Sequence, residues 1–297
     1  MPELPEVQTI VSDLNKKVIG RRVSGVWFDT PKMIKKPIPK EFGKQIEGLK
    51  ISRVERRGKN ILIYLSNAPR MKILLIHQKM TGHLLYGKWS MRKRPHEYEI
   101  KSLIKGPLEE KVNGYIHLVF YLDNGWQLAL SDLRKFAKVI FGPREEVHNL
   151  PELKKLGPDA LAKSFSVSQF ISLVSSQKRK VKQVLMDQNV IAGIGNIYAD
   201  EILWLAKIHP LRKANQLKAN ELRSSYLSMR QILKKALKLR GTSISDFRDT
   251  AGEAGGYGNI RLAYGREGEA CCRCKTAIKR IKIGGRSSSY CPKCQDL

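Results

Sequence analysis

Four cysteines near the end of the sequence constrain the fold more tightly than any other feature. Cys271 and Cys274 form one C-x2-C pair, Cys291 and Cys294 form a second, and sixteen residues lie between the pairs. Four thiolates at this spacing can surround one tetrahedral zinc ion from two tight knuckles. Cys272 is a spare thiol, because a ligand there leaves only one residue before Cys274. We therefore expect one structural Zn2+ in a C-terminal zinc-finger hairpin.

Disulfides are the alternative use of these cysteines, and the rest of the sequence disfavours them. The segment MPELPEV at the start contains Glu3 and Glu6 and no apolar stretch, so it does not resemble a signal peptide. No segment approaches the roughly 20 apolar residues of a membrane-spanning helix. We expect a soluble cytoplasmic protein without a membrane partner, and disulfides are rare in that compartment.

The charge of the chain points to a polyanionic partner. There are 55 Lys and Arg residues against 27 Asp and Glu, a formal net charge of +28. The excess is spread over both halves, so it is not a basic tail, and nucleic acid is the natural partner. A highly charged but merely soluble surface is the simpler alternative. The hairpin favours DNA contact, because no acidic residue lies between its first and last cysteines and seven basic ones do: Arg273, Lys275, Lys279, Arg280, Lys282, Arg286 and Lys293.

The pattern of apolar residues predicts an α+β chain with several domains. A helix follows Pro5, because apolar residues recur at helical spacing up to Val18, and Gly20 can end it. The segment 87–114 is polar and basic and is expected to be a long loop or insertion. Pro143 and Pro151 bracket an expected linker. Short strands separated by Gly, Asn and Asp predict a β-sandwich or barrel-like domain, at 23–28, 60–65, 72–76, 115–122, 126–130 and 137–141.

After residue 151 the period becomes helical. Helices are expected near 167–175, 178–187, 196–206 and 215–239. Asn196 can cap the third of these helices, and the glycines before it allow a phosphate to approach the helix start. A glycine-rich turn before a helix is weak evidence by itself. Residues 249–265 are rich in glycine and are expected to form a mobile loop before the hairpin.

Several motifs in this order resemble the formamidopyrimidine-DNA glycosylase family, which is related to endonuclease VIII. They are MPELPEV, Lys59 before a strand, the segment HQKMTG at 77–82, DLRKF at 132–136, GNIYADE at 195–201, YGR at 264–266 and the cysteine hairpin. The resemblance spans essentially the whole chain. It implies an N-terminal β-sandwich with flanking helices, a helix–two-turn–helix domain and a zinc-finger β-hairpin.

The resemblance implies a set of catalytic residues at the start of the chain. After removal of Met1, the secondary amine of Pro2 is the nucleophile that forms a Schiff base with the sugar. Glu3 is the proton donor, Glu6 supports the site one helical turn later, and Lys59 is a proton donor for β-elimination. A terminal amine titrates near pH 8 in model peptides, so part of it is neutral and reactive near pH 7.

The resemblance also implies residues that hold the DNA. Met80, Arg134 and Phe136 match a trio that fills the gap left by a flipped nucleotide, which suits two apolar side chains and a cation. Leu133, Lys135 and Ala137 depart from the commoner DPRRFG form of this loop. Lys182, Asn196 and Arg286 match phosphate-binding positions.

These assignments predict four segments and one reaction. They are a catalytic β-sandwich domain over 1–145, a helix–two-turn–helix domain over 151–248, a lesion-recognition loop and connector over 249–265, and a zinc finger over 266–297. The expected protein is a monomer that removes oxidised purines from double-stranded DNA and cleaves the resulting abasic site by β,δ-elimination. Leu4 favours this purine branch over an endonuclease VIII-like activity on oxidised pyrimidines. Two further classes of protein stay open, a non-catalytic protein that binds damaged DNA and a tautomerase with an N-terminal proline.

Overall fold

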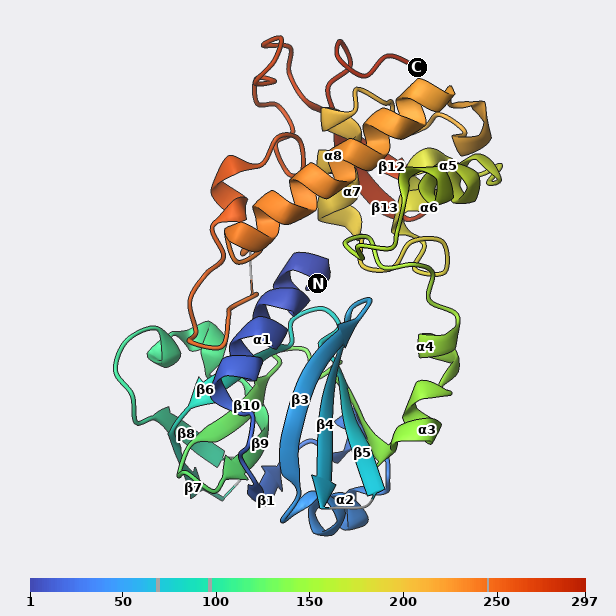
Figure 1. Ribbon diagram of the computed structural model, residues 1–297. Helices are drawn as coiled ribbons and strands as arrows, with labels where there is room; N and C mark the ends of the chain where they lie inside the picture. The colour runs from blue at the N-terminus through green and yellow to red at the C-terminus, as the bar shows by residue number, and fades with distance from the viewer. Residues whose placement is uncertain (68–69, 96–97, 245) are drawn as a thin grey trace. The chain divides into compact units, whose positions relative to one another are not determined.

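The computed structural model describes residues 1–67, 70–95, 98–244 and 246–297, which form two compact units (Figure 1). The first unit contains Met1–Lys154 together with Arg240–Gly256, and the second contains Lys155–Leu239 together with Tyr257–Leu297. The segment Arg240–Gly256 therefore groups with the first unit, whereas the sequence suggested a helical domain up to 248 and then a separate connector. Within the described ranges, no helix is long and apolar enough to cross a membrane.

Two sheets make up most of the first unit. All neighbouring strands are antiparallel except β2 and β11, which are parallel. The first sheet has the order β1 (Val23–Phe28), β9 (Ile116–Leu122), β10 (Gln127–Ser131) and β6 (His83–Gly87). The second has the order β2 (Ile34–Lys36), β11 (Lys138–Pro143), β5 (Arg70–His77), β4 (Asn60–Asn67) and β3 (Lys50–Arg57).

The two sheets share one apolar core, which confirms the predicted β-sandwich. Alternate residues of β4, such as Ile61 and Ile63, and alternate residues of β9, such as Leu118 and Phe120, belong to the same buried cluster. Successive side chains of a strand point to opposite faces, so these residues line the inner faces of both sheets. The sandwich therefore provides a rigid base for the loops at the ends of its strands.

Helix α1 (Leu4–Lys17) packs on this sandwich and fixes the start of the chain. Val7, Ile10 and Leu14 are fully buried in the sandwich core, as their helical spacing predicts. Gly20, just after the helix, has a φ of +82°, which suits a glycine at a helix end. The same unit holds a 3-10 turn η1 (Pro31–Met33) and a short helix α2 (Pro39–Ile46).

The prediction of a long loop over 87–114 is wrong for most of that segment. It contains the antiparallel strands β7 (Trp89–Lys93) and β8 (Tyr98–Ser102), followed by η2 (Pro107–Glu109) and η3 (Lys111–Asn113). Trp89 is buried with Leu85 and Ala129 on the outer face of the first sheet. The many polar and basic residues of these two strands hid them, because Trp89 is buried and Met91 and Ile100 are only partly buried. The expected linker between Pro143 and Pro151 contains the short helix α3 (Arg144–His148), and α4 (Pro151–Lys154) follows it.

The second unit is helical before its C-terminal hairpin. Ser166 caps α5, because its Oγ accepts a hydrogen bond from Gln169 N at 3.2 Å. Between α6 (Val181–Met186) and α7 (Asn196–Leu205) the chain makes two turns. Gln188 joins these turns, because its side chain accepts a hydrogen bond from Gly193 N at 2.9 Å and donates one to Ile194 O at 2.7 Å. The elements are α5 (Val167–Ser175), α6 (Val181–Met186), α7 (Asn196–Leu205), η4 (Ala214–Gln216) and α8 (Ala219–Lys238).

The C-terminal hairpin of the second unit consists of β12 (Lys279–Ile283) and β13 (Arg286–Tyr290), and η5 (Tyr257–Ile260) precedes it. Gly284 and Gly285 connect the strands, with φ values of +55° and +75°. Two residues with positive φ form the tight turn that matches the twist of an antiparallel pair. This hairpin confirms the C-terminal part of the predicted fold.

Candidate active site and nucleic-acid interface

The start of α1 is buried and held by a carboxylate. Pro2 is buried, and Glu3 and Glu6 are only 2% and 1% exposed. One oxygen of Glu6 accepts a hydrogen bond from Glu3 N at 2.8 Å, and the other accepts from Thr242 N at 2.7 Å. Glu6 therefore ties the residue after Pro2 to the segment Arg240–Gly256 of the same unit. This geometry gives Glu6 a positioning role.

Gly241 leaves the space that Glu6 needs. Its φ is +85°, a conformation that favours glycine. A Cβ at this position would lie 2.7 Å from Oε1 of Glu6, closer than the two atoms can approach. The sequence contained no signal for this contact, because the two residues are far apart along the chain.

Lys59 lies near the chain start, in the turn between β3 and β4, and is 6% exposed. Burial lowers the pKa of the terminal amine of Met1 below its ordinary value of 8.0, while the charges of Glu3 and Glu6 raise the pKa and that of Lys59 lowers it. These four groups are thus within electrostatic range of one another. The structure brings together the predicted set of Pro2, Glu3, Glu6 and Lys59.

His77, at the end of β5, lies among several cations. Burial and the nearby charges of Lys79 and Lys59 lower its pKa to about 4. Its Nδ1 atom accepts a hydrogen bond from Lys79 N at 3.0 Å. His77 is therefore a neutral imidazole near pH 7, beside a group of lysines that suits an anionic ligand.

Two neighbouring loops, which we call the wedge loops (78–82 and 132–137), present the predicted trio. Arg134 and Phe136 are exposed, Phe136 to 51%, and Met80 is half-buried. The guanidinium group of Arg134 lies 4.6 Å from the centre of the Phe136 ring. An exposed phenyl ring on a loop of a well-packed unit is available for contact with a base.

Asp132 and Thr81 hold the wedge loops together, and sequence reasoning gave neither of them a role. Asp132 is fully buried, and its side chain accepts hydrogen bonds from Thr81 Oγ1 and, at 2.7 Å, from Ala137 N. Arg134 N donates to Thr81 Oγ1 at 3.2 Å. Lys135 adopts a φ of +57°, so the loop makes its turn without the glycine or proline of the commoner motif.

The start of α7 differs in one detail from the expectation. Gly195 is the N-cap residue, and Asn196 is the first residue of the helix. The Oδ1 atom of Asn196 is buried and has no hydrogen-bond partner among the described residues. The predicted glycine-rich helix start is therefore present, with its cap one residue earlier.

The structure disagrees with the expected direct phosphate contact of Lys182. This side chain is 1% exposed, and its Nζ atom donates to Asp200 Oδ1 and to Ser287 O, both at 2.7 Å. Burial raises the pKa of Asp200 to about 6. Arg286, one residue before Ser287, is exposed at the start of β13. Lys182 therefore supports the hairpin from inside, and Arg286 is the residue that a phosphate can reach.

Glu201 is a second buried acid of the GNIYADE segment with an unforeseen role. It is fully buried and accepts four hydrogen bonds. The donors are Tyr257 Oη at 3.0 Å, Leu262 N at 2.8 Å, and Ala263 N and Tyr264 N at 2.9 Å. Glu201 thus fixes the segment that leads into the zinc-finger hairpin.

The four predicted cysteines converge at the base of the hairpin. The Sγ atoms of Cys271, Cys274, Cys291 and Cys294 all lie within 4.8 Å of one another. A tetrahedral zinc ion with bonds of about 2.3 Å places its sulfur ligands about 3.8 Å apart, so the cluster fits this metal. These cysteines form the site of one structural zinc ion.

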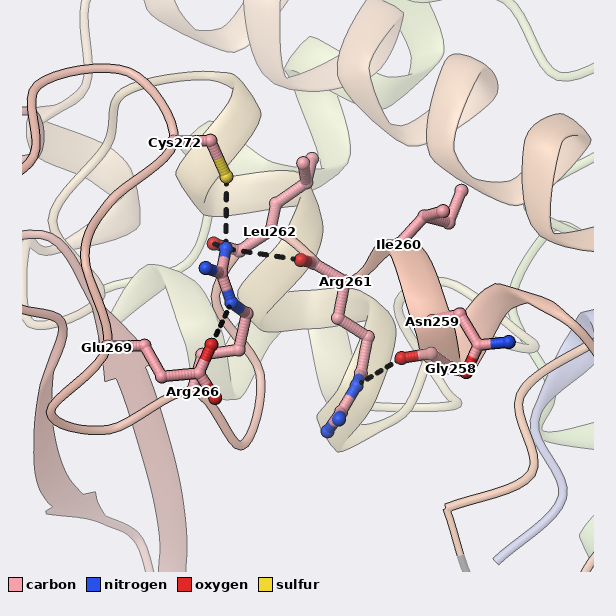
Figure 2. A pocket seen from close by; sticks show the side chains of 8 residues that line it. All are labelled: Gly258, Asn259, Ile260, Arg261, Leu262, Arg266, Glu269 and Cys272. Carbon is pink, nitrogen blue, oxygen red and sulfur yellow. Dashed lines mark hydrogen bonds and ion pairs between the residues drawn. The ribbon is translucent and has the colours of Figure 1, made fainter.

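Cys272 is separate from this cluster, as its spacing predicted. Its exposed thiol accepts a hydrogen bond from Arg266 Nη1 at 3.0 Å, and Arg266 Nε donates to Glu269 at 2.8 Å. Figure 2 shows Arg266 between these two partners, at the edge of a pocket of about 480 Å3. The arginine of the YGR segment therefore organises the chain just before the first knuckle.

Comparison with protein-family models covers most of the chain. Residues 1–139 match the model described as Formamidopyrimidine-DNA glycosylase N-terminal domain. Residues 156–248 match the Formamidopyrimidine-DNA glycosylase H2TH domain. Residues 268–297 match the zinc finger found in FPG and IleRS. The order of the three agrees with the fold described above.

Full-length relatives and solved structures are also similar. The formamidopyrimidine-DNA glycosylase of Herpetosiphon aurantiacus is 38% identical, over 99% of this chain and 100% of the relative. That of Pelotomaculum thermopropionicum is 37% identical over 100% of both. A complex of Lactococcus lactis Fpg with abasic-site DNA has a TM-score of 0.84 and 31% identity, covering 99% of this chain and 100% of the other. The same enzyme bound to N7-benzyl-Fapy-dG DNA has a TM-score of 0.84 and 32% identity, over 100% of both chains.

Proposed function

This chain belongs to the formamidopyrimidine-DNA glycosylase family, and we propose that the amine of its Pro2 is the nucleophile. The protein is a DNA glycosylase and AP lyase that acts on oxidised purines in base-excision repair. The observation that supports the residue assignment best is the start of α1. There Pro2 and Glu3 are buried, Glu6 holds the backbone, and the charge of Lys59 lowers the pKa of the neighbouring terminal amine of Met1.

The first steps of the proposed reaction use Pro2 and Glu3. Removal of Met1 frees the secondary amine of Pro2, whose neutral form attacks C1′ of the damaged nucleotide. The bond from C1′ to the base breaks, and the base leaves with the electron pair and takes up the proton that the Pro2 nitrogen loses after its attack. Glu3 donates a proton to the sugar ring oxygen as the ring opens, which leaves an iminium between Pro2 and C1′.

The iminium makes strand cleavage possible, because it withdraws electrons from the sugar. Loss of a proton from C2′ then breaks the C3′–O bond, and loss of a proton from C4′ breaks the C5′–O bond. In this proposal Lys59 is the proton donor for the first of these eliminations. Glu6 holds the start of α1 so that Pro2 is correctly placed relative to the sugar. Zinc takes no part in these steps and stabilises the hairpin.

The remaining predicted residues are assigned to holding the DNA. Met80, Arg134 and Phe136 fill the space of the flipped nucleotide, because the wedge loops present them together. Asn196 and Arg286 bind backbone phosphates, at a helix start and at the exposed first position of β13. We propose that the protein acts as a monomer on double-stranded DNA in the bacterial cytoplasm. All assigned groups come from one chain, and sedimentation of the complex with DNA tests the stoichiometry.

Borohydride trapping tests the proposal directly. The processed protein is incubated with a duplex containing 8-oxoguanine and reduced, and a covalent protein–DNA species is expected. Pro2→Gly should lose this species and keep its affinity for the duplex, because the DNA-holding residues are unchanged. Absence of trapping by the processed wild type would reject the enzymatic assignment in favour of a non-catalytic DNA-binding protein. An intact-mass measurement establishes that Met1 has been removed.

Oxidised pyrimidines are a second candidate class of substrate. Lactococcus lactis Fpg, a structural neighbour at 31% identity, has been solved with DNA containing an oxidised pyrimidine. The same trapping assay with an oxidised-pyrimidine duplex, in competition with 8-oxoguanine, ranks the two classes. We expect more trapped species with the purine duplex than with the pyrimidine duplex. Preferential trapping on the pyrimidine duplex would reverse this assignment.

A further inference from the structure

The second unit contains a buried ion pair, formed by a lysine that the family resemblance assigned to a DNA phosphate. Lys182 of α6 and Asp200 of α7 are each 1% exposed and lie 2.7 Å apart. Buried charges are costly unless they are paired and hydrogen-bonded, and a well-packed apolar pair often stabilises a fold equally well. The presence of this pair therefore needs an explanation beyond joining two helices.

Further hydrogen bonds of the pair converge on strand β13. Lys182 Nζ donates to Ser287 O at 2.7 Å, while Asp200 accepts from Ser288 Oγ and from Ser289 N, both at 2.8 Å. Ser288 is fully buried and Ser289 is 5% exposed, so these bonds are shielded from water. Three consecutive residues of the strand are thus fixed to α6 and α7.

The turn of the hairpin is fitted to the same helix. A Cβ on Gly284 would lie 2.6 Å from the side-chain nitrogen of Gln183, the neighbour of Lys182 in α6. The hairpin tip therefore packs closely on α6 at the point where the ion pair fixes β13. Arg286 lies between these two attachments, at the first position of the strand.

The zinc site is too distant to fix this end of the hairpin. Cys291 lies four positions after Ser287 in the sequence. This spacing corresponds to about 13 Å of extended strand. A two-stranded hairpin is marginally stable by itself, so an anchor at its base leaves the tip free to move. The ion pair supplies the anchor that the metal cannot.

We propose that the Lys182–Asp200 pair is a positioning device that holds Arg286 in place for a DNA phosphate, independently of the zinc ion. This inference rests on the proposed function, because it requires Arg286 to bind DNA. Lys182 and Asp200 are positioning residues that act through the backbone of β13. The hairpin then has two separate supports, the metal at its base and the ion pair near its tip.

Asp200→Asn tests the proposal because charge and geometry predict opposite results. Removing a negative charge should by itself tighten binding to DNA, as we expect for Glu267→Gln, an exposed matched control whose partner is Arg280. Loss of positioning should instead weaken binding roughly tenfold and lower the salt dependence by about one phosphate contact. Zinc content should stay at one ion per chain, and amide exchange should accelerate in Ser287–Tyr290.

A double-mutant comparison with Arg286→Ala tests whether Asp200 acts on DNA affinity through Arg286. If Asp200 acts through Arg286, Asp200→Asn should weaken wild-type binding and add little in the Arg286→Ala background. Ser288→Ala removes one hydrogen bond to Asp200, and its loss of DNA affinity should also be non-additive with that of Arg286→Ala, but smaller. This variant replaces Asp200→Asn in the test if Asp200→Asn does not fold.

Fully additive losses, unchanged exchange in β13 or loss of zinc in Asp200→Asn would each overturn the proposal. The proposal would also be overturned if the Arg286→Ala variant bound duplex DNA as tightly as the wild type does. That last result leaves borohydride trapping by the wild type intact, so it is distinct from a failure of the proposed function.

Discussion

The two units hold their functional elements by different means. In the first unit, α1 is fixed by apolar residues that belong to the continuous core of the sandwich, and Glu6 adds hydrogen bonds to backbone groups. In the second, the base of the hairpin shares a small apolar cluster with Trp204, Ala263 and Ile278. It depends on four cysteines and on the buried acids Asp200 and Glu201.

This contrast favours the view that the reaction and the binding of DNA depend on different structural elements. The reacting amine needs a position accurate to a fraction of an ångström, and a large packed core provides such rigidity. Phosphate contacts tolerate more freedom, so a small motif fixed by a metal and ion pairs is sufficient. Substitutions in the first unit should therefore reduce the rate of reaction, and those in the hairpin should reduce affinity.

Gly241→Ala should have the largest effect, on the rate. A Cβ there collides with Oε1 of Glu6, at 2.7 Å, and displaces the carboxylate that holds the start of α1. We expect single-turnover excision of 8-oxoguanine to slow about a hundredfold, as for a misplacement of about 1 Å in other active sites. Affinity for uncleaved duplex should change little.

Gly125→Ala is the matched control for this prediction. Gly125 has a φ of +74°, and a Cβ there meets nothing within 4 Å, so the variant carries the same backbone strain without the collision. It should react at nearly the wild-type rate. Equal slowing of both variants, or a loss of affinity with an unchanged rate in Gly241→Ala, would contradict the assigned separation of roles.

Cys291→Ser should act on the second unit and on affinity. Loss of one thiolate weakens the zinc site, and the hairpin that carries Arg286 loses its base. We expect affinity for duplex DNA to fall by roughly tenfold or more, while trapping at saturating protein persists. Cys272→Ser removes a thiol outside the cluster and should keep both zinc and affinity. Retention of full affinity in zinc-free Cys291→Ser would remove the hairpin from the DNA interface.

Local patterns predicted much of this architecture. Helical spacing after Pro5 located α1, and apolar runs located strands such as β4 and β9, because these elements are buried along a whole face or on both faces. The pattern missed β2, β3, β6, β7 and β8. In β3, β7 and β8 polar and basic residues occupy most of the exposed positions, so only tertiary packing reveals the buried ones.

The candidate site divides in the same way. Residues that occur in short motifs could be singled out from the sequence. The spacing of the four cysteines predicted their cluster, which is confirmed, and the role that the family resemblance gives to Pro2 stays a prediction. Contacts between distant segments could not, because no local pattern encodes the bond from Thr242 to Glu6 or the bonds from Asp200 to β13. Lys182 shows the limit most clearly, since its match to a phosphate-binding position of the family does not reveal that the side chain is buried.

Phe136→Ala tests the separation of roles with a smaller effect. Phe136 lies in the first unit but is assigned to DNA, so its loss should reduce the population of the flipped nucleotide by about tenfold. Leu133→Ala is the control, because Leu133 belongs to the same loop and is 48% exposed, close to the 51% of Phe136. Fluorescence of a base analogue opposite the lesion reports flipping directly. If both variants flip alike, the assignment of Phe136 as a wedge fails.

The weakest effect that we expect concerns the stability of the first unit against acid. The pKa of His77 is lowered to about 4 in the folded protein, whereas a histidine in the unfolded chain titrates near 6.5. Between these values the unfolded state binds more protons, so stability should decrease as the pH falls from 6.5 to 4. His77→Gln should remove about 2 kcal/mol of that decrease, as measured by urea unfolding at pH 7 and pH 4.5. An equally steep decrease in the variant would show that His77 is not held neutral by the core and the lysines around it. That result would weaken the argument that the first unit owes its rigidity to packing.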